Sequence, residues 1–128
     1  MRFVVPAVLL LVALIHALPL VGVMGAAKLS QLYGVDAQDP TLEILLRHRA
    51  VLFGLLAAFL AYAAIRPELH RLALVAGFIS VASFLVLAKL SASYNSELST
   101  VVRADWLALA LLAVGAVAHQ WPFTRDLG

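Results

Sequence analysis

The chain has 128 residues, of which 64% are hydrophobic and 12% are charged. Soluble domains carry about 25% charged residues, so this composition argues against a soluble fold and predicts a membrane protein. Nine basic and seven acidic residues give a net charge of +2, and we expect no nucleic-acid partner from so small a surplus. Cysteine is absent, which excludes disulfides, thiolate nucleophiles, cysteine-ligated metals and thioether-linked haem.

Four apolar segments follow one another along the chain: residues 3–29, 41–65, 69–93 and 97–120. A helix needs about 20 apolar residues to cross a hydrocarbon core, and each segment is longer than that. Because lipid offers backbone groups no hydrogen-bond partner, the spans are predicted to be helices. The predicted fold is all-α: one integral membrane four-helix bundle, up-down-up-down, with both termini on the same side.

The first segment has an alternative interpretation as a cleaved signal peptide. Arg2 precedes the apolar run, and GAAK at 25–28 has the small residues of a cleavage site. A signal peptide, however, has only about 7 to 15 residues in its apolar region. Removal of this longer segment would also leave an odd number of spans. We therefore expect it to be retained as the first helix.

Polar residues predict where helices begin. Asp39 followed by Pro40 is typical of an N-cap and first turn. Pro67 predicts the start of the third helix, and Asn95 predicts the start of the fourth.

Basic residues predict the orientation. One end of the bundle collects Arg2, Arg66, Arg71 and Arg125, and the other collects Lys28, Arg47, Arg49, Lys89 and Arg103. Most of the second group falls within the predicted helices, whereas the positive-inside rule weighs loop charges. Both termini are therefore predicted to be cytoplasmic.

The second helix carries charged and small residues on one face. With 3.6 residues per turn, that face holds Glu43, Arg47, Ala50, Gly54, Ala57 and Ala61. Small residues allow membrane helices to approach closely, so Arg47 is predicted to point into the bundle. Glu43 is its expected i,i+4 partner. His48 and Arg49 project to either side.

Polar residues of three helices converge on one end of the predicted bundle: Glu43, Arg47, Arg49, Tyr94, Asn95, Arg103 and Asp105. Charges within a span are costly and are by default a functional hypothesis. Two interpretations stay open. In one, Arg47 pairs with Glu43 and Arg103 with Asp105, which forms a clamp that only fixes helix register. In the other, the clamp also binds an anionic or polar headgroup, because guanidinium suits carboxylate and phosphate.

His16 falls near the middle of the first predicted helix, three residues before Pro19, whose ring should kink that helix. Ser80 and Ser83 are its candidate partners. Either His16 is a buried neutral histidine bonded to such a group, or it serves a ligand, quinone or proton. His48 lies about 7 Å from the level of His16, so the two cannot share a haem. We expect no metal and no cofactor.

Four stretches carry a resemblance to a known family: IHALPLVGVMGAAKL (15–29), DPTLEILLRHRAVLFGLL (39–56), GFISVASF (77–84) and YNSELSTVVRADWLAL (94–109). Over most of its length the chain resembles small four-span bacterial membrane proteins of uncharacterised function. Members are often labelled phosphopantetheine adenylyltransferase in genome listings. That enzyme is a soluble α/β nucleotidyltransferase with an HxGH motif, which this chain lacks. The resemblance supports the topology only and supplies no catalytic residues. We expect the chain to lie in a bacterial inner membrane.

We expect a binding protein for a lipid, a quinone or a similar amphiphile, monomeric or homo-oligomeric. The predicted ligand-binding residues are Arg47, Arg103, Glu43, Asp105, Tyr94, Asn95, His16, Arg49 and His48. Arg47 and Arg103 would hold the anionic or carbonyl group. Glu43 and Asp105 would orient these arginines, and His16 would mark the deeper tail of the cavity.

Three other functions remain open. An enzyme would use Glu43 or Asp105 as general base, although acid and imidazole fall on different helices at different depths. A transporter would need a dimer, since four short helices make a poor conduit. It would also differ from small multidrug transporters, which carry a glutamate in their first helix where this chain has His16. A structural subunit would use the charged cluster to dock on a partner.

Overall fold

The computed structural model describes residues 3–36 and 38–126, with side chains described as far as residue 120. Its elements, in chain order, are α1 Val4–Ala17, the 3₁₀ helix η1 Leu18–Met24, α2 Ala26–Tyr33, α3 Pro40–Ala64, the 3₁₀ helix η2 Pro67–Leu69, α4 His70–Leu90 and α5 Ser96–Asp126. No strand occurs in this part of the chain. The predicted all-α fold is confirmed.

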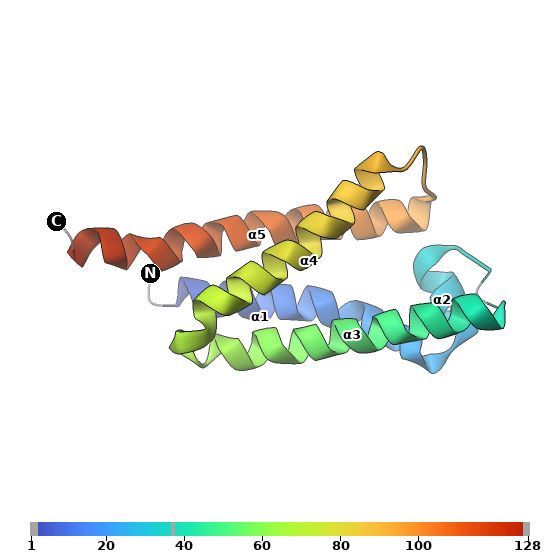
Figure 1. Ribbon diagram of the computed structural model, residues 1–128, viewed down its shortest axis with the longest axis horizontal. Helices are drawn as coiled ribbons and strands as arrows, with labels where there is room; N and C mark the ends of the chain where they lie inside the picture. Colours follow the sequence, from blue (N-terminus) through green and yellow to red (C-terminus); the bar gives the residue numbers. More distant parts are fainter. Residues whose placement is uncertain (1–2, 37, 127–128) are drawn as a thin grey trace.

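Four segments are long and apolar enough to cross a membrane: Val4–Met24, Pro40–Ala64, Pro67–Leu90 and Ser96–Gln120. They alternate in direction, so the two termini lie at one end of the bundle and α2 lies at the other (Figure 1). We call these the termini end and the α2 end. The up-down-up-down topology is thus confirmed.

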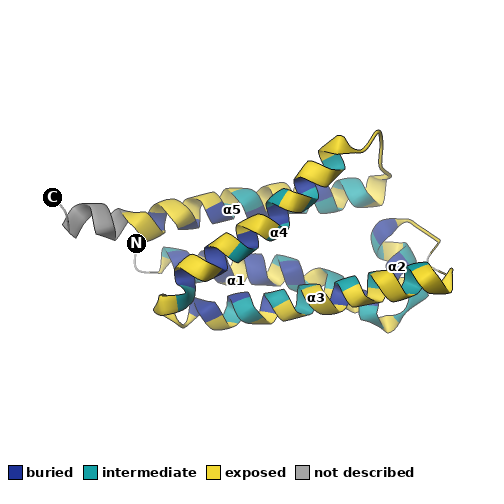
Figure 2. Ribbon diagram, in the orientation of Figure 1, coloured by how far each residue is buried: buried dark blue, intermediate teal, exposed yellow. Residues whose placement is uncertain are grey.

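The core lies around α1, which contacts all three other long helices. Leu9 and Val12 of α1 are fully buried, as are Leu60 of α3 and, to 98%, Leu112 of α5. Exposed residues cover the outer faces of the long helices (Figure 2). A bundle with apolar side chains on its outside as well as its inside suits surrounding lipid rather than water.

Small residues let the helices pack closely, as the sequence predicts. A Cβ added to Gly54 of α3 would lie 2.6 Å from Leu20 Cδ1 of η1. A Cβ on Gly115 of α5 would lie 3.0 Å from Val8 Cγ1 of α1. A larger side chain at Gly115 would press on Val8 and Leu74, and one at Gly54 would displace the end of the Leu20 side chain.

The first span is shorter than the predicted helix 3–29, and that prediction is corrected. α1 ends at Ala17 and the chain tightens into η1, because Pro19 has no N–H to continue the α-helical bonding. Gly25 then turns the chain at φ +128°, a conformation that favours glycine. The residues beyond it form a separate helix, α2, which packs against η1, α3 and α5.

Predicted helix starts are confirmed at two capping residues. The Asp39 carboxylate accepts a hydrogen bond from the Thr41 backbone N–H at 3.1 Å, directly before α3. Asn95 Oδ1 accepts one from the Leu98 N–H at 2.8 Å and caps α5. The same Asn95 amide donates through Nδ2 to the carbonyl oxygens of Tyr33 (2.7 Å) and Gly34 (3.3 Å). One side chain therefore joins the end of α2 to the beginning of α5.

Candidate functional site

A cavity of about 330 Å³ lies at the α2 end, walled by the end of α1, η1, α2, α3 and α5. We call it the inner cavity. Most of its wall is apolar, and its polar side chains include His16, Arg49 and Asp105. Its exposed lining residues are Leu18, Gln31, Glu97 and Thr100. The cavity therefore opens between η1 and α2 on one side and α5 on the other.

Arg49 of α3 is held in this cavity by aromatic rings. Its guanidinium carbon lies 4.5 Å from the ring centroid of Phe53, 5.5 Å from that of Phe84 and 5.6 Å from that of Tyr33. A cation this close to a ring face is attracted by the ring quadrupole. Three rings from α3, α4 and α2 thus fix one cation.

The donors of Arg49 have no protein acceptor. Among the side chains that the structure describes, those of residues 3–36 and 38–120, the Arg49 guanidinium has no hydrogen-bond or ion-pair partner, and no fully buried polar side-chain atom is left without a partner. The Arg49 N–H groups are therefore accessible from the cavity. A guanidinium offers five donors in a planar fork, so Arg49 is ready to bind an acceptor oxygen from outside the chain.

Asp105 of α5 lines the same cavity. Arg49 and Asp105 each lie nine residues from the start of their own helix, about 14 Å along the helix axis. They interact electrostatically without approaching to ion-pair distance, as the described ion pairs are Arg47–Glu43 and Arg66–Glu68. Arg49 and Asp105 thus bring opposite charges to a cavity whose lining is mostly apolar.

His16 is 97% buried at the end of α1, beside the cavity. Its Nδ1 lies 2.9 Å from the Val12 carbonyl oxygen and its Nε2 lies 3.0 Å from Ser80 Oγ. Because a carbonyl can only accept, Nδ1 is the donor, and Nε2 of a neutral ring accepts from the Ser80 hydroxyl. The predicted Ser80 partner is confirmed. Both ring nitrogens are used within the protein.

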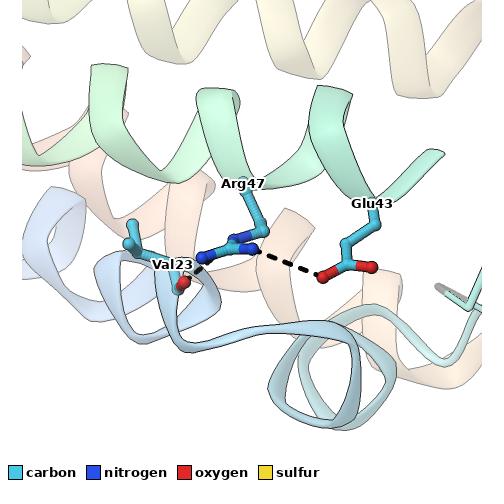
Figure 3. Close-up of polar contacts among 3 residues, drawn as sticks. All are labelled: Val23, Glu43 and Arg47. Atoms are coloured by element: carbon cyan, nitrogen blue, oxygen red, sulfur yellow. Dashed lines mark hydrogen bonds and ion pairs between the residues drawn. The ribbon is translucent and has the colours of Figure 1, made fainter. Parts of the chain in front are cut away.

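Arg47 forms the predicted i,i+4 pair, at 3.5 Å from Nη1 to Glu43 Oε1 (Figure 3). Its Nε also donates to the Val23 carbonyl oxygen at 3.0 Å. That carbonyl is in the last turn of η1, where helical partners run out. Arg47 therefore joins α3 to η1. Arg47 does not line the inner cavity, nor a second cavity at the same end of the bundle. Its predicted role of holding a ligand therefore finds no support in its position.

The predicted pairing of Arg103 with Asp105 is wrong. Arg103 is exposed and donates through Nε to the Ser99 carbonyl oxygen of its own helix at 3.5 Å. Residues two apart on a helix project from opposite faces. Asp105 faces the inner cavity and Arg103 faces away. His48 is also exposed, and it lines neither the inner cavity nor the second cavity at this end of the bundle.

A second cavity, of about 370 Å³, lies closer to the helix ends. We call it the outer cavity. Its walls come from α3, α4, the beginning of α5 and the chain beside α2, and include Leu42, Leu46 and Leu98. Tyr94 and Asn95, both predicted site residues, line it. Of the nine predicted residues, the structure thus brings His16, Arg49 and Asp105 to the inner cavity and Arg49, Tyr94 and Asn95 to the outer one.

The aromatic residues around Arg49 are absent from the predicted site. Phe53 had a local signal, because it lies four residues after Arg49 on the same helix. Tyr33 and Phe84 had none, since they reach Arg49 only through the placement of α2 and α4. An arginine within an apolar span is a reason to search for aromatic neighbours as well as acids.

In the described part of the chain, no three histidine, aspartate or glutamate side chains are placed to share a metal ion. Comparison of the chain with protein-family models, with curated proteins and with solved structures finds no match. The two cavities and the guanidinium between them are therefore the basis for inferring what the protein does.

Proposed function

We propose that this protein binds a membrane amphiphile, such as a lipid or a quinone, in the inner cavity, with Arg49 holding the acceptor oxygen of the polar group. The observation that carries the proposal is the unpaired Arg49 fork in an apolar cavity. Hydrogen bonds from an ionised donor are stronger than neutral ones, and low dielectric strengthens them further. A hydrogen bond from Arg49 to an oxygen of the ligand would therefore contribute more binding free energy in this cavity than the same bond in water.

The shape of the cavity favours an amphiphile over a water-soluble ligand. Its wall includes Ile15, Leu32 and Val101, and its mouth includes Leu18 and Thr100 of two spanning segments. The part of the mouth between Leu18 and Thr100 would admit a ligand sideways from the surrounding leaflet, whereas the part with Gln31 and Glu97 is polar. Pockets of this size and apolar character, with few polar groups, are typical of small-molecule sites.

The other polar side chains have supporting roles in this proposal. Asp105 attracts the Arg49 guanidinium and accepts a hydrogen bond from any hydroxyl on the ligand. His16 and Ser80 satisfy each other and shape the deep wall. A histidine whose two nitrogens are engaged supports binding more than acid–base catalysis, which needs a group within reach of the ligand.

We further propose the inner membrane of a bacterium, with both termini cytoplasmic and the α2 end on the opposite side. Arg66 and Arg71 near the short α3–α4 connection at the termini end support this orientation. Reporter fusions to the C-terminus test it: we expect a cytoplasmic reporter to be active and an exported one to be silent. The reverse pattern would overturn the orientation.

An assembly subunit finds less support. The small-residue faces that could dock a partner are used within the chain, where Gly54 meets Leu20 and Gly115 meets Val8. A dimeric transporter would need a similar face. The proposal therefore remains a binding protein, whether monomeric or homo-oligomeric.

Native mass spectrometry of the detergent-extracted protein tests the binding function. The comparison is among the unaltered protein, R49Q and the matched control R103Q, whose guanidinium is exposed and outside both cavities. We expect a bound amphiphile in the unaltered protein and in R103Q, and its loss in R49Q. Equal retention of the amphiphile in all three would overturn the proposal.

A further inference from the structure

Arg49 and Tyr33 are the residues that line both cavities. The inner cavity reaches Ile15 and Phe53, deep in the spans, whereas the outer cavity is lined by Leu42 and Leu98. These two leucines lie two residues inside their helices, about 3 Å from the helix ends. The inner cavity also reaches Glu97 at the beginning of α5, so it extends from the helix ends into the bundle, whereas the described lining of the outer cavity includes no residue of α1 or η1. The Arg49 guanidinium lies where the two volumes meet.

A group bound at Arg49 has room on both of its sides. A carboxylate at the end of an acyl chain would occupy the inner cavity and leave the outer one unused. A bridging anion uses both, because it carries a substituent in each direction. A phosphodiester is such an anion, and its two non-bridging oxygens match the guanidinium fork.

The outer cavity also limits the headgroup. Its described lining residues include no carboxylate, and Arg49 is its charged side chain. An ammonium headgroup would find a cation there and no carboxylate among the lining residues, since Glu97, beside Gly34 and Asn95, lines the inner cavity instead. The hydroxyls of Tyr33 and Tyr94 have no hydrogen-bond partner among the described residues, so they are free to bind hydroxyl groups.

From this arrangement, and resting on the proposed function, we propose that the ligand is an anionic phosphodiester lipid with an uncharged, hydroxylated headgroup. Its phosphate lies on Arg49, the upper part of its chains lies in the inner cavity, and its headgroup enters the outer cavity between Tyr33 and Tyr94. The chain ends leave through the mouth between Leu18 and Thr100 into the leaflet.

Binding of three lipids with matched chains to the purified full-length protein tests this assignment. The probes are phosphatidylglycerol, phosphatidic acid, which lacks the headgroup, and phosphatidylethanolamine, which carries an ammonium. We expect phosphatidylglycerol to bind about tenfold more tightly than either of the others, corresponding to about 1.4 kcal/mol. Equal binding of phosphatidic acid, or of phosphatidylethanolamine, would overturn the assignment.

Two tryptophan variants on α3 locate the headgroup. L46W places an indole in the outer cavity, whereas Leu45 is exposed on the outer face, so L45W is the matched control. We expect L46W to reduce phosphatidylglycerol binding to the level of phosphatidic acid and to leave phosphatidic acid unchanged, while L45W alters neither. If L46W fails to fold, L42W fills the same cavity from one turn earlier. An unchanged preference for phosphatidylglycerol in the folded variant would overturn the assignment.

Different results would overturn the proposed function and the headgroup assignment. If R49Q loses all three lipids and the unaltered protein does not distinguish them, the binding function stands and the headgroup assignment falls. If R49Q binds every lipid as well as the unaltered protein, the role of Arg49 falls and both proposals fall with it.

Discussion

Arginines at the two ends of the bundle differ in their hydrogen-bond partners. At the termini end, Arg66 donates through Nε to Glu68 at 2.6 Å and through Nη1 to the Tyr62 hydroxyl at 2.8 Å. The hydrogen bond to Glu68 raises the pKa of the Arg66 guanidinium. At the α2 end, Arg49 contacts rings and has no acceptor among the described residues.

The difference follows from how each arginine is surrounded. Arg66 finds its partners within four residues along the chain, in a tight exposed connection, so its donors are used as soon as that connection forms. Arg49 contacts one local ring, that of Phe53, and two rings, those of Tyr33 and Phe84, that reach it only in the folded bundle, so its neighbours supply aromatic carbon rather than oxygen. The Arg66 donors at the termini end are therefore satisfied within the chain, whereas the Arg49 donors at the α2 end have no acceptor among the described residues, which supports the proposed binding function.

The largest effect expected from this contrast is on ligand affinity. R49Q should weaken binding about 10- to 100-fold, because a hydrogen bond to a charged group contributes about 1.5 to 3 kcal/mol. R66Q should leave affinity unchanged. R49K is a second control that keeps the charge and loses the planar fork, and it should fall between R49Q and the unaltered protein. Lipid titration by native mass spectrometry measures all three variants, and a loss of affinity in R66Q would break the contrast.

A second effect should appear in the stability of the α2 end alone. N95A removes the cap of α5 and both hydrogen bonds to the end of α2, at a cost of about 2 kcal/mol. Amide hydrogen exchange should rise in α2 and at the start of α5, with no change around η2. N95D keeps the capping oxygen and loses the Nδ2 donor, so it should raise exchange in α2 more than in α5. Equal increases at both ends of the bundle in N95A would contradict this assignment.

Sequence predicted the spans well because span length follows from hydrocarbon thickness, which does not depend on tertiary contacts. It predicted the start of α3 because Asp39 and Pro40 act within one turn. It failed at the end of the first span, where Pro19 and Gly25 together convert a continuous helix into η1, a turn and α2. Pro19 and Gly25 are both evident in the sequence, but the long apolar run around them favoured the prediction of a single continuous helix.

The site was less predictable for a related reason. The pair Arg47–Glu43 was found because it is local on one helix. Arg103 was assigned to Asp105 because the two are close in sequence, although helical geometry turns them apart. Arg49 was included among the site residues, but its central position depends on rings from α2 and α4. Charge alone indicated the end of the bundle where the two cavities lie, but it could not select which arginine lines them.

A third effect, smaller than the first two, concerns His16. S80A removes the hydroxyl bonded to Nε2 and leaves a buried acceptor unpaired, which costs about 1 kcal/mol. S83A is the matched control, because Ser83 is exposed and its hydroxyl donates to the Ser80 carbonyl oxygen. Thermal unfolding in detergent should show a lower Tm for S80A than for S83A. Equal Tm values would mean that the histidine finds another donor, such as water.

The smallest effect should be equal at the two ends of the bundle. E43Q removes the ion pair with Arg47, and E68Q removes the ion pair with Arg66. Both pairs are accessible to water, and exposed ion pairs add little to stability because water and salt screen them. Arg47 also keeps its bond to the Val23 carbonyl when Glu43 is neutral. We expect each variant to shift Tm less than S80A does and to leave lipid affinity unchanged.

A Tm loss in E43Q larger than that in S80A would show that Glu43 does more than pair with Arg47. In that case the α2 end would differ from the termini end in its ion pair as well as in its free guanidinium.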